Sequence, residues 1–450
     1  MKISIQNLGA IEKADIDLCK KLIVFCGPNG TGKTYISYVI YGYAKLVMGP
    51  LSNLFKLQDL IEKKEVVFEL DYKSLFDLQN NSFKFLKDNI SSEFASNKFL
   101  FTNFDIKLII PLEEFRNNLF QSALSYDYEF GGISLHLAKE SRSNSVKINL
   151  IKPLDLSIKR DDFTGVVINA YLSKYLFNST ILYSYILPVE RNSVYTFSKE
   201  LSLKRLRKSN DNIEESAEVQ ERMTRYPRAI IDALTVAEDL ANIKKKKSEF
   251  HILADVIENE ILHGKISISD QGEVQFSPDN ASDVVLPVHL SASLIKTLSG
   301  LIIYLRHQAN LNDLIIIDEP ELNLHPDNQI RLARIIARLI NAGFRIIIST
   351  HSDYIIRELN NLIMLSSDKT EIKEIAKRNK YKNDEMILPE KVGAYLFNFN
   401  SNDNTKVIVE NLTVDENGFE VKTIDDAINK LNDISDDLFD ALKYSENADS

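Results

Sequence analysis

LIVFCGPNGTGKT, residues 22–34, is the stretch that decides the fold. Its first five residues, 22–26, are apolar and predict a short buried strand that ends at Gly27. Residues 27–34 match the P-loop pattern GxxxxGK[ST], and a helix is expected over 33–47. A glycine-rich turn between a strand and a helix directs backbone N–H groups at phosphate oxygens, and the helix N-terminus adds partial positive charge. The stretch therefore predicts a nucleotide-binding α/β fold.

The P-loop residues have distinct predicted roles. We expect the phosphates of ATP to be bound by Gly27, Pro28, Asn29, Gly30, Thr31, Gly32, Lys33 and Thr34. Lys33 reaches the β- and γ-phosphates and so has a catalytic role, and the Thr34 hydroxyl ligates Mg²⁺. The predicted substrate is thus ATP and the predicted cofactor is Mg²⁺. A glycine-rich turn that matches by chance is the alternative, which the flanking strand and helix disfavour.

A second motif, LIIIDEP, occupies residues 314–320. An apolar strand that ends in two acids is a Walker B arrangement. Asp318 is expected to hold Mg²⁺ through water, and Glu319 to act as the general base on the attacking water. Taken alone, the pattern equally fits a buried strand that ends in exposed acids. The P-loop in the same chain favours the catalytic interpretation.

A third motif, IIISTHS, occupies residues 346–352. An apolar strand again ends in a polar turn, which here carries His351, one of seven histidines in the chain. An isolated histidine is most often an ordinary surface residue. The position after the Walker B motif instead predicts a catalytic residue that senses the γ-phosphate.

These three motifs, in this order, resemble the ATP-binding-cassette class of P-loop ATPases, which includes the heads of RecF and SMC proteins. The resemblance implies an α/β head with a mixed sheet flanked by helices. Residues 321–326, ELNLHP, resemble the D-loop of OLD and related AAA-type ATPases that are grouped with bacterial anti-phage systems. It implies that Asn323 and His325 lie at a dimer interface, where an ordinary loop is the alternative. The resemblance covers residues 1–45 and 285–365.

ATPases of this class carry a signature sequence at the start of a helix before Walker B. The candidate here is LSASL, residues 290–294, although both glycines and the glutamine of the family pattern are replaced. The resemblance implies that Ser291, together with Ser293, contacts the γ-phosphate bound to the opposite subunit. A plain serine N-cap is the alternative. Residues 185–191, YILPVER, resemble a segment near the nucleotide, so Glu190 and Arg191 are weaker candidates that a structural salt bridge would explain equally well.

Four segments describe the expected domain organisation. Residues 1–50 form the N-terminal part of the head, and 51–285 form a large α+β insertion, mainly helical, with a small hairpin over 132–137 and 146–151. Residues 286–400 form the C-terminal part of the head with the signature, Walker B and His351. Residues 401–450 form a hairpin and an acidic helical tail. Further helices are expected over 57–64, 72–94 and 166–177, and a strand over 180–187.

Composition narrows the function. The 450 residues include 54 Lys and Arg against 64 Asp and Glu, a net charge of −10, which disfavours a globally basic nucleic-acid binder. Two basic clusters, 204–208 and 244–247, leave local DNA contact possible, although solvated helix faces are the simpler interpretation. Neither an apolar stretch of about 18 residues nor an export signal is present, so no membrane partner and a cytoplasmic location are expected.

The sequence therefore predicts an ATP-hydrolysing head that forms a homodimer or higher oligomer around ATP. By the resemblance, it would control a separate effector protein, a nuclease or toxin, in an anti-phage system. Nuclease chemistry of the Toprim type is not expected in this chain, because no DxD follows the one candidate strand, 407–410. Two alternatives stay open: a RecF-like DNA-repair ATPase acting directly on DNA, and the ATPase subunit of a membrane transporter. A nucleotide-binding scaffold without turnover is a third.

Overall fold

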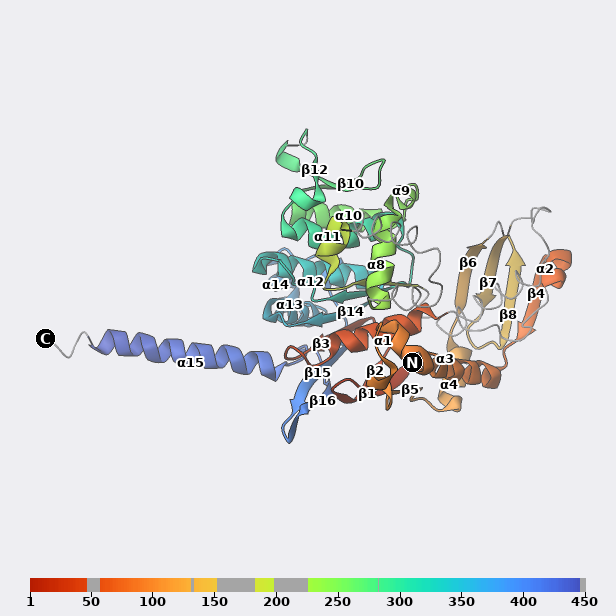
Figure 1. Ribbon diagram of the computed structural model, residues 1–450, viewed down its shortest axis with the longest axis horizontal. Coiled ribbons are helices and arrows are strands. Elements are labelled where there is room, and N and C mark those ends of the chain that lie inside the picture. Colours follow the sequence, from red (N-terminus) through yellow and green to blue (C-terminus); the bar gives the residue numbers. More distant parts are fainter. Residues whose placement is uncertain (47–56, 131–132, 152–182, 198–225, 282, 446–450) are drawn as a thin grey trace, which may run out of the picture.

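The computed structural model describes residues 1–46, 57–130, 133–151, 183–197, 226–281 and 283–445. Its centre is a nine-stranded mixed sheet in the order β5-β1-β2-β16-β15-β3-β14-β13-β9, flanked by helices (Figure 1). The strands are β1 (Lys2–Leu8), β2 (Ile11–Asp17), β3 (Leu22–Cys26), β5 (Asp105–Leu108), β9 (Ser184–Leu187), β13 (Leu314–Asp318), β14 (Arg345–Thr350), β15 (Val392–Asn400) and β16 (Asp403–Leu412). The α/β head with a mixed sheet that the sequence predicts is confirmed.

Five neighbouring strands, β15, β3, β14, β13 and β9, are all parallel. Residues 22–26 and 314–318 are completely buried. Parallel strands are covered by helices on both faces, so their sequences are apolar without alternation. Register pairs Ile317 with Ile348, and Ile348 with Val24, so the carboxyl ends of β13, β14 and β3 lie side by side.

The other strands make mostly antiparallel pairs. β1 pairs with β2 and with β5 in antiparallel fashion, and β15 does so with β16, whereas β16 runs parallel to its other neighbour, β2. The expected domain boundary at residue 400 therefore falls inside a hairpin whose two strands both belong to the central sheet. β5 and β9, from the expected insertion 51–285, also lie in this sheet. β9 lies within the strand that the sequence predicts over 180–187, whereas β5 was not predicted, because its four residues are too few for a clear periodic pattern.

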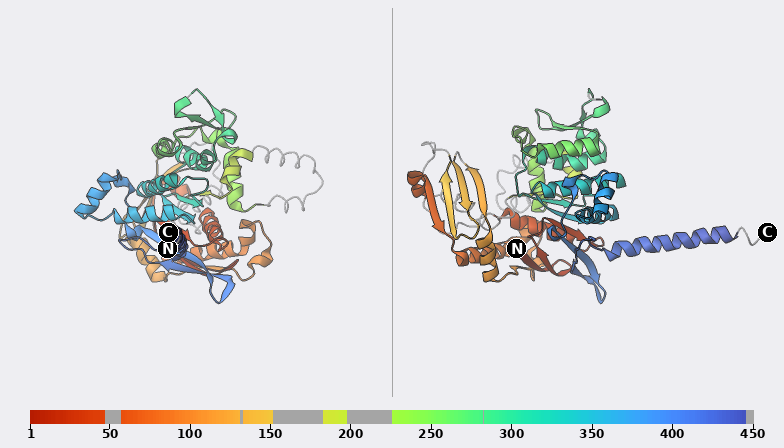
Figure 2. Two further views of the ribbon diagram at one scale, coloured as in Figure 1. Left: turned by 90° about the vertical axis from the view of Figure 1, so that its left-hand side faces the viewer. Right: turned by 180° about the vertical axis from the view of Figure 1, so that it is seen from behind.

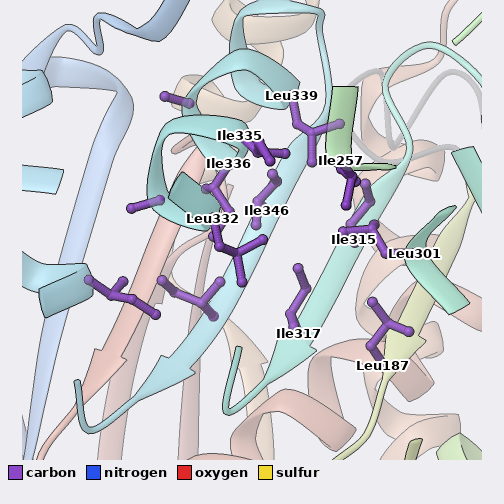
Figure 3. Packing of buried hydrophobic residues seen from close by; sticks show 14 of the residues in the cluster. Leu187, Ile257, Leu301, Ile315, Ile317, Leu332, Ile335, Ile336, Leu339 and Ile346 are labelled. Atoms are coloured by element: carbon purple, nitrogen blue, oxygen red, sulfur yellow. The ribbon is translucent and has the colours of Figure 1, made fainter. Parts of the chain in front are cut away.

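Helices cover both faces of the sheet. On one face pack α1 (Lys33–Lys45) and α3 (Tyr72–Glu93). On the other pack α10 (His251–Ile257), α11 (Ser293–His307), α12 (Pro326–Asn341) and α13 (Asp353–Met364). Figure 3 shows Leu332, Ile336 and Leu339 of α12 over Ile315 and Ile346 of the sheet. This double cover holds the strand ends rigidly, which is what a site built on them needs.

Smaller units surround the head. A four-stranded antiparallel sheet, in the order β4-β8-β7-β6, lies at one end of the molecule (Figure 1). Its strands are β4 (Glu65–Glu69), β6 (Leu124–Phe130), β7 (Ile133–Lys139) and β8 (Ser145–Leu150). The predicted hairpin is confirmed as β7–β8, but the sequence missed β4 and β6 beside it. A three-stranded sheet comprises β10 (Gly264–Ile268), β11 (Val274–Pro278) and β12 (Leu286–Pro287).

The remaining helices are α2 (Leu57–Lys63), α4 (Leu112–Gln121), α8 (Arg228–Glu238), α9 (Leu240–Ile243), α14 (Thr370–Arg378) and α15 (Lys422–Ser445). α15 projects away from the rest of the molecule (Figure 1 and the right-hand view of Figure 2). The helix expected over 166–177 and the basic cluster 204–208 lie outside the described residues. Among the helices that are described, none has both the length and the apolar character needed to cross a bilayer.

Candidate nucleotide-binding site

The three motifs meet at one cavity. The P-loop follows β3, the two acids end and follow β13, and His351 follows β14. The cavity measures about 430 Å³ and is lined by Gly9, Ala10, Asn29, Gly30, Gly32, Lys33, Thr34, Tyr35, Asp318, Glu319, Ser349 and His351. Small-molecule sites typically measure roughly 300–1,000 Å³, so the cavity has the size of a ligand pocket.

Gly27 is the residue at which the P-loop leaves the sheet. Its φ of +128° is unfavourable for residues with a side chain, and a Cβ there would lie 2.0 Å from the backbone oxygen of Phe397 on β15. Glycine is therefore required here both by backbone conformation and by the closeness of the neighbouring strand. This contact places the start of the P-loop against the hairpin β15–β16.

Lys33, the first residue of α1, is buried at the base of the P-loop, with 6% of its surface exposed. Its Nζ donates hydrogen bonds to the backbone oxygens of Gly27 (2.9 Å) and Pro28 (2.7 Å). Burial lowers the pKa of Lys33 to about 8, against an opposing effect of nearby Asp318 and Glu319. A cation held by neutral carbonyl groups at a cavity wall is arranged to receive an anion such as phosphate.

Thr34 and Asp318 lie side by side in the wall of the cavity. The Thr34 hydroxyl donates to Asp318 Oδ2 at 2.7 Å, and the Ser349 hydroxyl donates to Oδ1 of the same carboxylate. Asp318 is 1% exposed, and burial raises its pKa despite these two hydrogen bonds.

The Thr34–Asp318 pair fits Mg²⁺. A hydroxyl and a carboxylate are hard oxygen donors, and Mg²⁺ typically binds one or two carboxylates together with substrate phosphates and water. The described residues contain no cluster of three or more His, Cys, Asp or Glu side chains that could hold a metal ion unaided. The donor set thus suits an ion shared with a nucleotide.

Glu319 has a strained backbone, with φ +48°. Its N–H donates to the Ser349 oxygen at 3.0 Å, and its carbonyl accepts from Arg191 Nη2 at 2.6 Å. Arg191 Nη1 donates to the Asp318 carbonyl, also at 2.6 Å. Residues other than glycine rarely adopt positive φ, and such conformations persist where the surroundings fix them. Arg191 is one of the groups that hold Glu319 in this conformation.

Arg191 makes hydrogen bonds to backbone carbonyl groups in the interior of the protein. It is 2% exposed, and burial lowers its pKa to about 10. The described hydrogen bonds of its guanidinium run to the carbonyls of Asp318, Glu319 and Pro188. Glu190 beside it is exposed and does not line the cavity.

His351 lies at the far side of the cavity, with Nε2 3.9 Å from Glu319 Oε1. Burial, followed by the charge of Lys33, lowers its pKa to about 4, so the ring is neutral near pH 7. Its backbone N–H donates to Glu321 Oε1 at 2.6 Å, and the Thr350 hydroxyl donates to Glu321 Oε2 at 2.9 Å. Glu321 was quoted in the D-loop pattern but given no role, and it ties the loop after β13 to the turn that carries His351.

A family model described as an AAA ATPase domain matches residues 1–356 of the chain. The chain belongs to this family. Among solved structures, this AAA ATPase is similar to three SMC head domains. One is the SMC head bound to the C-terminal winged-helix domain of ScpA (11% identity, TM-score 0.36, 92% of this chain and 98% of that one).

The second is the SMC head domain from Thermotoga maritima (12% identity, TM-score 0.30, 91% of this chain and 98% of that one). The third is the SMC head with an extended coiled coil bound to the C-terminal domain of ScpA, from Pyrococcus furiosus (13% identity, TM-score 0.34, 96% and 98%). No curated protein matches the sequence.

The expected signature residues do not line this cavity. Ser293 begins α11, and the N-cap is Ala292, without a side-chain hydrogen bond to the helix. The serine N-cap alternative is thus not what the structure of this AAA ATPase has. The Ser291 hydroxyl instead donates to the Pro287 carbonyl at 3.3 Å, and the preceding Leu290 is 68% exposed. Of the D-loop residues, Asn323 is exposed, and the His325 ring accepts a hydrogen bond from the N–H of Asp327 at the start of α12.

Three residues that line the cavity escaped the sequence analysis. Gly9 and Ala10 form the turn between β1 and β2, and Tyr35 follows the P-loop on α1. The Tyr35 ring is 45% exposed and lies against Phe94, with 5.1 Å between ring centroids. A turn of two small residues carries no signal for nucleotide binding, because its place beside the P-loop depends on the folded sheet.

Proposed function

We propose that this AAA ATPase binds and hydrolyses ATP, dimerises around it, and controls a separate effector protein. The observation that carries the proposal is the convergence of Lys33, Thr34, Asp318, Glu319 and His351 on one cavity from three neighbouring parallel strands. Phosphoryl transfer to water needs mainly positioning and charge neutralisation, and these side chains supply both.

Each side chain has a defined task in the proposed mechanism. Lys33 would exchange its backbone partners for the β- and γ-phosphates. Thr34 and Asp318 would hold Mg²⁺, which supplies charge neutralisation at the phosphates. Glu319 would accept the proton of the attacking water. His351, being neutral, can donate one ring N–H to the γ-phosphate, and Arg191 would keep the backbone that carries both acids in place.

Dimerisation would complete the site. Ser291 and Ser293 lie at the start of α11 outside the cavity of their own chain, so a second chain would have to bring them to the nucleotide. A helix N-terminus there would direct N–H groups at the γ-phosphate. The first test is light scattering of Glu319→Gln with ATP and Mg²⁺, for which we expect a dimer. A species that remains monomeric at saturating ATP would contradict the sandwich.

Steady-state ATP turnover tests the ATPase itself. We expect a rate that Lys33→Ala abolishes and that double-stranded DNA does not change. A rate equal in the wild type and Lys33→Ala would contradict the assignment of the site.

Direct action on DNA is the second candidate function. Lys245, Lys246 and Lys247 are exposed in the turn after α9, whereas Lys244 pairs with Asp270 at 2.6 Å. If DNA stimulates turnover, and Lys245→Glu with Lys246→Glu removes the stimulation, the repair-type function replaces effector control. The control of an effector rests on the resemblance of residues 321–326 and on the lack of nuclease motifs in the sequence.

A further inference from the structure

Helix α15 exposes a row of large apolar side chains to solvent. The exposed fractions are 66% for Leu431, 45% for Ile434, 61% for Leu438, 65% for Phe439 and 72% for Leu442. Figure 1 and the right-hand view of Figure 2 show this helix projecting away from the other elements. Contiguous exposed apolar surface on a folded protein typically marks an interaction site.

The sequence of α15 separates an apolar face from an acidic one. Leu431, Ile434, Leu438 and Leu442 follow one another at spacings of three, four and four residues, which place them along one face. The opposite face carries exposed Asp426, Asp433, Asp436, Asp437 and Asp440. The 24-residue helix contains six Asp and three Lys, so its net charge is 3 − 6 = −3.

Residues 418–421, the root of α15, precede this helix and pack against the head. Phe419 and Val421 are buried, with 4% and 2% exposed. The Asn360 side chain on α13 donates to the Phe419 carbonyl (2.8 Å) and accepts from the Phe419 N–H (3.0 Å). Gly418 lies so close that a Cβ there would be 2.2 Å from Asn360 Oδ1.

α13 connects this root to the nucleotide site. Its N-cap is Ser352, the residue directly after His351. A cavity of about 560 Å³ lies between the first turns of α13 and the segment before α15, with Asp353, Arg357 and Lys422 among its lining residues. One helix thus begins at the proposed γ-phosphate sensor and holds the base of α15.

We propose that α15 inserts its apolar face into an apolar groove of a partner protein whose rim carries Lys and Arg. The acidic flanks of α15 complement a basic rim and would be repelled by an acidic one. An anionic membrane surface attracts helices with a basic polar face, the opposite of this one. A second copy of α15 would bring together two helices that each carry a net charge of −3. The proposal deepens the proposed function and rests on it, because it describes how the effector is recognised.

The test uses the full-length chain and a designed probe. The probe is a labelled 24-residue helical peptide with leucines along one face and lysines flanking them, and its matched partner has glutamates in place of the lysines. Fluorescence anisotropy should show the lysine peptide binding at least about tenfold more tightly than the glutamate peptide. The double substitution Leu431→Asp and Leu438→Asp should weaken binding of the lysine peptide by at least about tenfold. Phe99→Asp, at a residue 85% exposed elsewhere, should leave binding unchanged.

Three results would overturn the proposal. One is equal binding, or none, of the two peptides. Another is a dimer without ATP that Leu431→Asp with Leu438→Asp converts to monomer, which would make a second copy the occupant. The third is flotation with phosphatidylcholine–phosphatidylglycerol vesicles that these substitutions abolish. ATP turnover is measured on the same variants and should equal the wild-type rate, so that a failure of docking is distinguishable from a failure of the ATPase.

Discussion

The two halves of the nine-stranded sheet differ in strand direction and in where their polar residues lie. In the parallel half, β3, β14 and β13 are buried on both faces and carry their polar residues just beyond one end. In the antiparallel half, which begins at the hairpin β15–β16, β1 and β2 run in opposite directions, so the carboxyl end of each lies beside the amino end of the other. Polar side chains gather where the carboxyl ends of parallel strands coincide, so the parallel half supplies the acids, the lysine and the histidine of the candidate site.

The antiparallel half supports that site without supplying its acids or its lysine. The turn of Gly9 and Ala10 forms part of the cavity wall, and Phe397 on β15 lies against Gly27. Substitutions in the parallel half should therefore lower ATP turnover, whereas substitutions that disturb contacts with the antiparallel half should lower stability. Each of the following variants of the site or its support has a matched control, and they run from the largest expected effect to the smallest.

Glu319→Gln should lower ATP turnover by about 10²–10⁴-fold, because general acid–base catalysis contributes this much. ATP affinity should change little, since the carboxylate would act on water. The matched control is Glu410→Gln, an exposed carboxylate on β16. Turnover of Glu319→Gln within threefold of the wild type would remove Glu319 from the mechanism.

Gly27→Ala should destabilise the protein by about 3 kcal/mol or more, because a strained φ is combined with a clash against the Phe397 carbonyl. The clash acts where the two halves meet, between β3 and β15. Gly30 also has a positive φ, +77°, but no atom lies within 4 Å of the Cβ that alanine would add. Gly30→Ala should therefore lower the free energy of unfolding by only about 1 kcal/mol. Urea titration followed by circular dichroism measures both, and equal midpoints would refute the steric argument.

Arg191→Met should lower kcat by roughly 10- to 100-fold, the range for residues that orient catalytic groups, with KM for ATP nearly unchanged. The control is Arg345→Met at the start of β14. Arg345 is also buried and donates to the carbonyls of Leu18, Cys19 and Lys20, but it lies at the opposite strand end from the cavity. Both variants should lose stability. A similar loss of kcat in Arg345→Met would mean that Arg191 acts through stability alone.

Tyr35→Ala should raise KM for ATP by up to about tenfold, since an aromatic contact contributes about 0.5–1.5 kcal/mol. Tyr354→Ala is the control, because Tyr354 is similarly exposed (48%) and does not line the cavity. The KM of each variant is obtained from initial rates measured over a range of ATP concentrations. If the two variants have the same KM, the Tyr35 ring does not contact the nucleotide.

The strands and helices around the motifs could be predicted closely from the sequence. β3 spans the predicted residues 22–26, and α12 begins at Pro326 and ends just before Gly343. Apolar runs bounded by glycine and proline are local signals that tertiary contacts rarely override. The strands β4, β5 and β6 were missed because they are short or largely polar. β4 and β5 pair with strands distant in sequence, and β6 pairs with the following strand, β7.

The sequence by itself determined the candidate site residues and their order, because each of the three motifs is local and lies at the end of an apolar strand. Tertiary structure alone decided what surrounds them. Arg191 reaches the carbonyls of Asp318 and Glu319 from more than a hundred residues away, and Gly9 and Ala10 reach the cavity through strand pairing. Only strand order and register, which are non-local properties, bring such groups within hydrogen-bonding distance of the site.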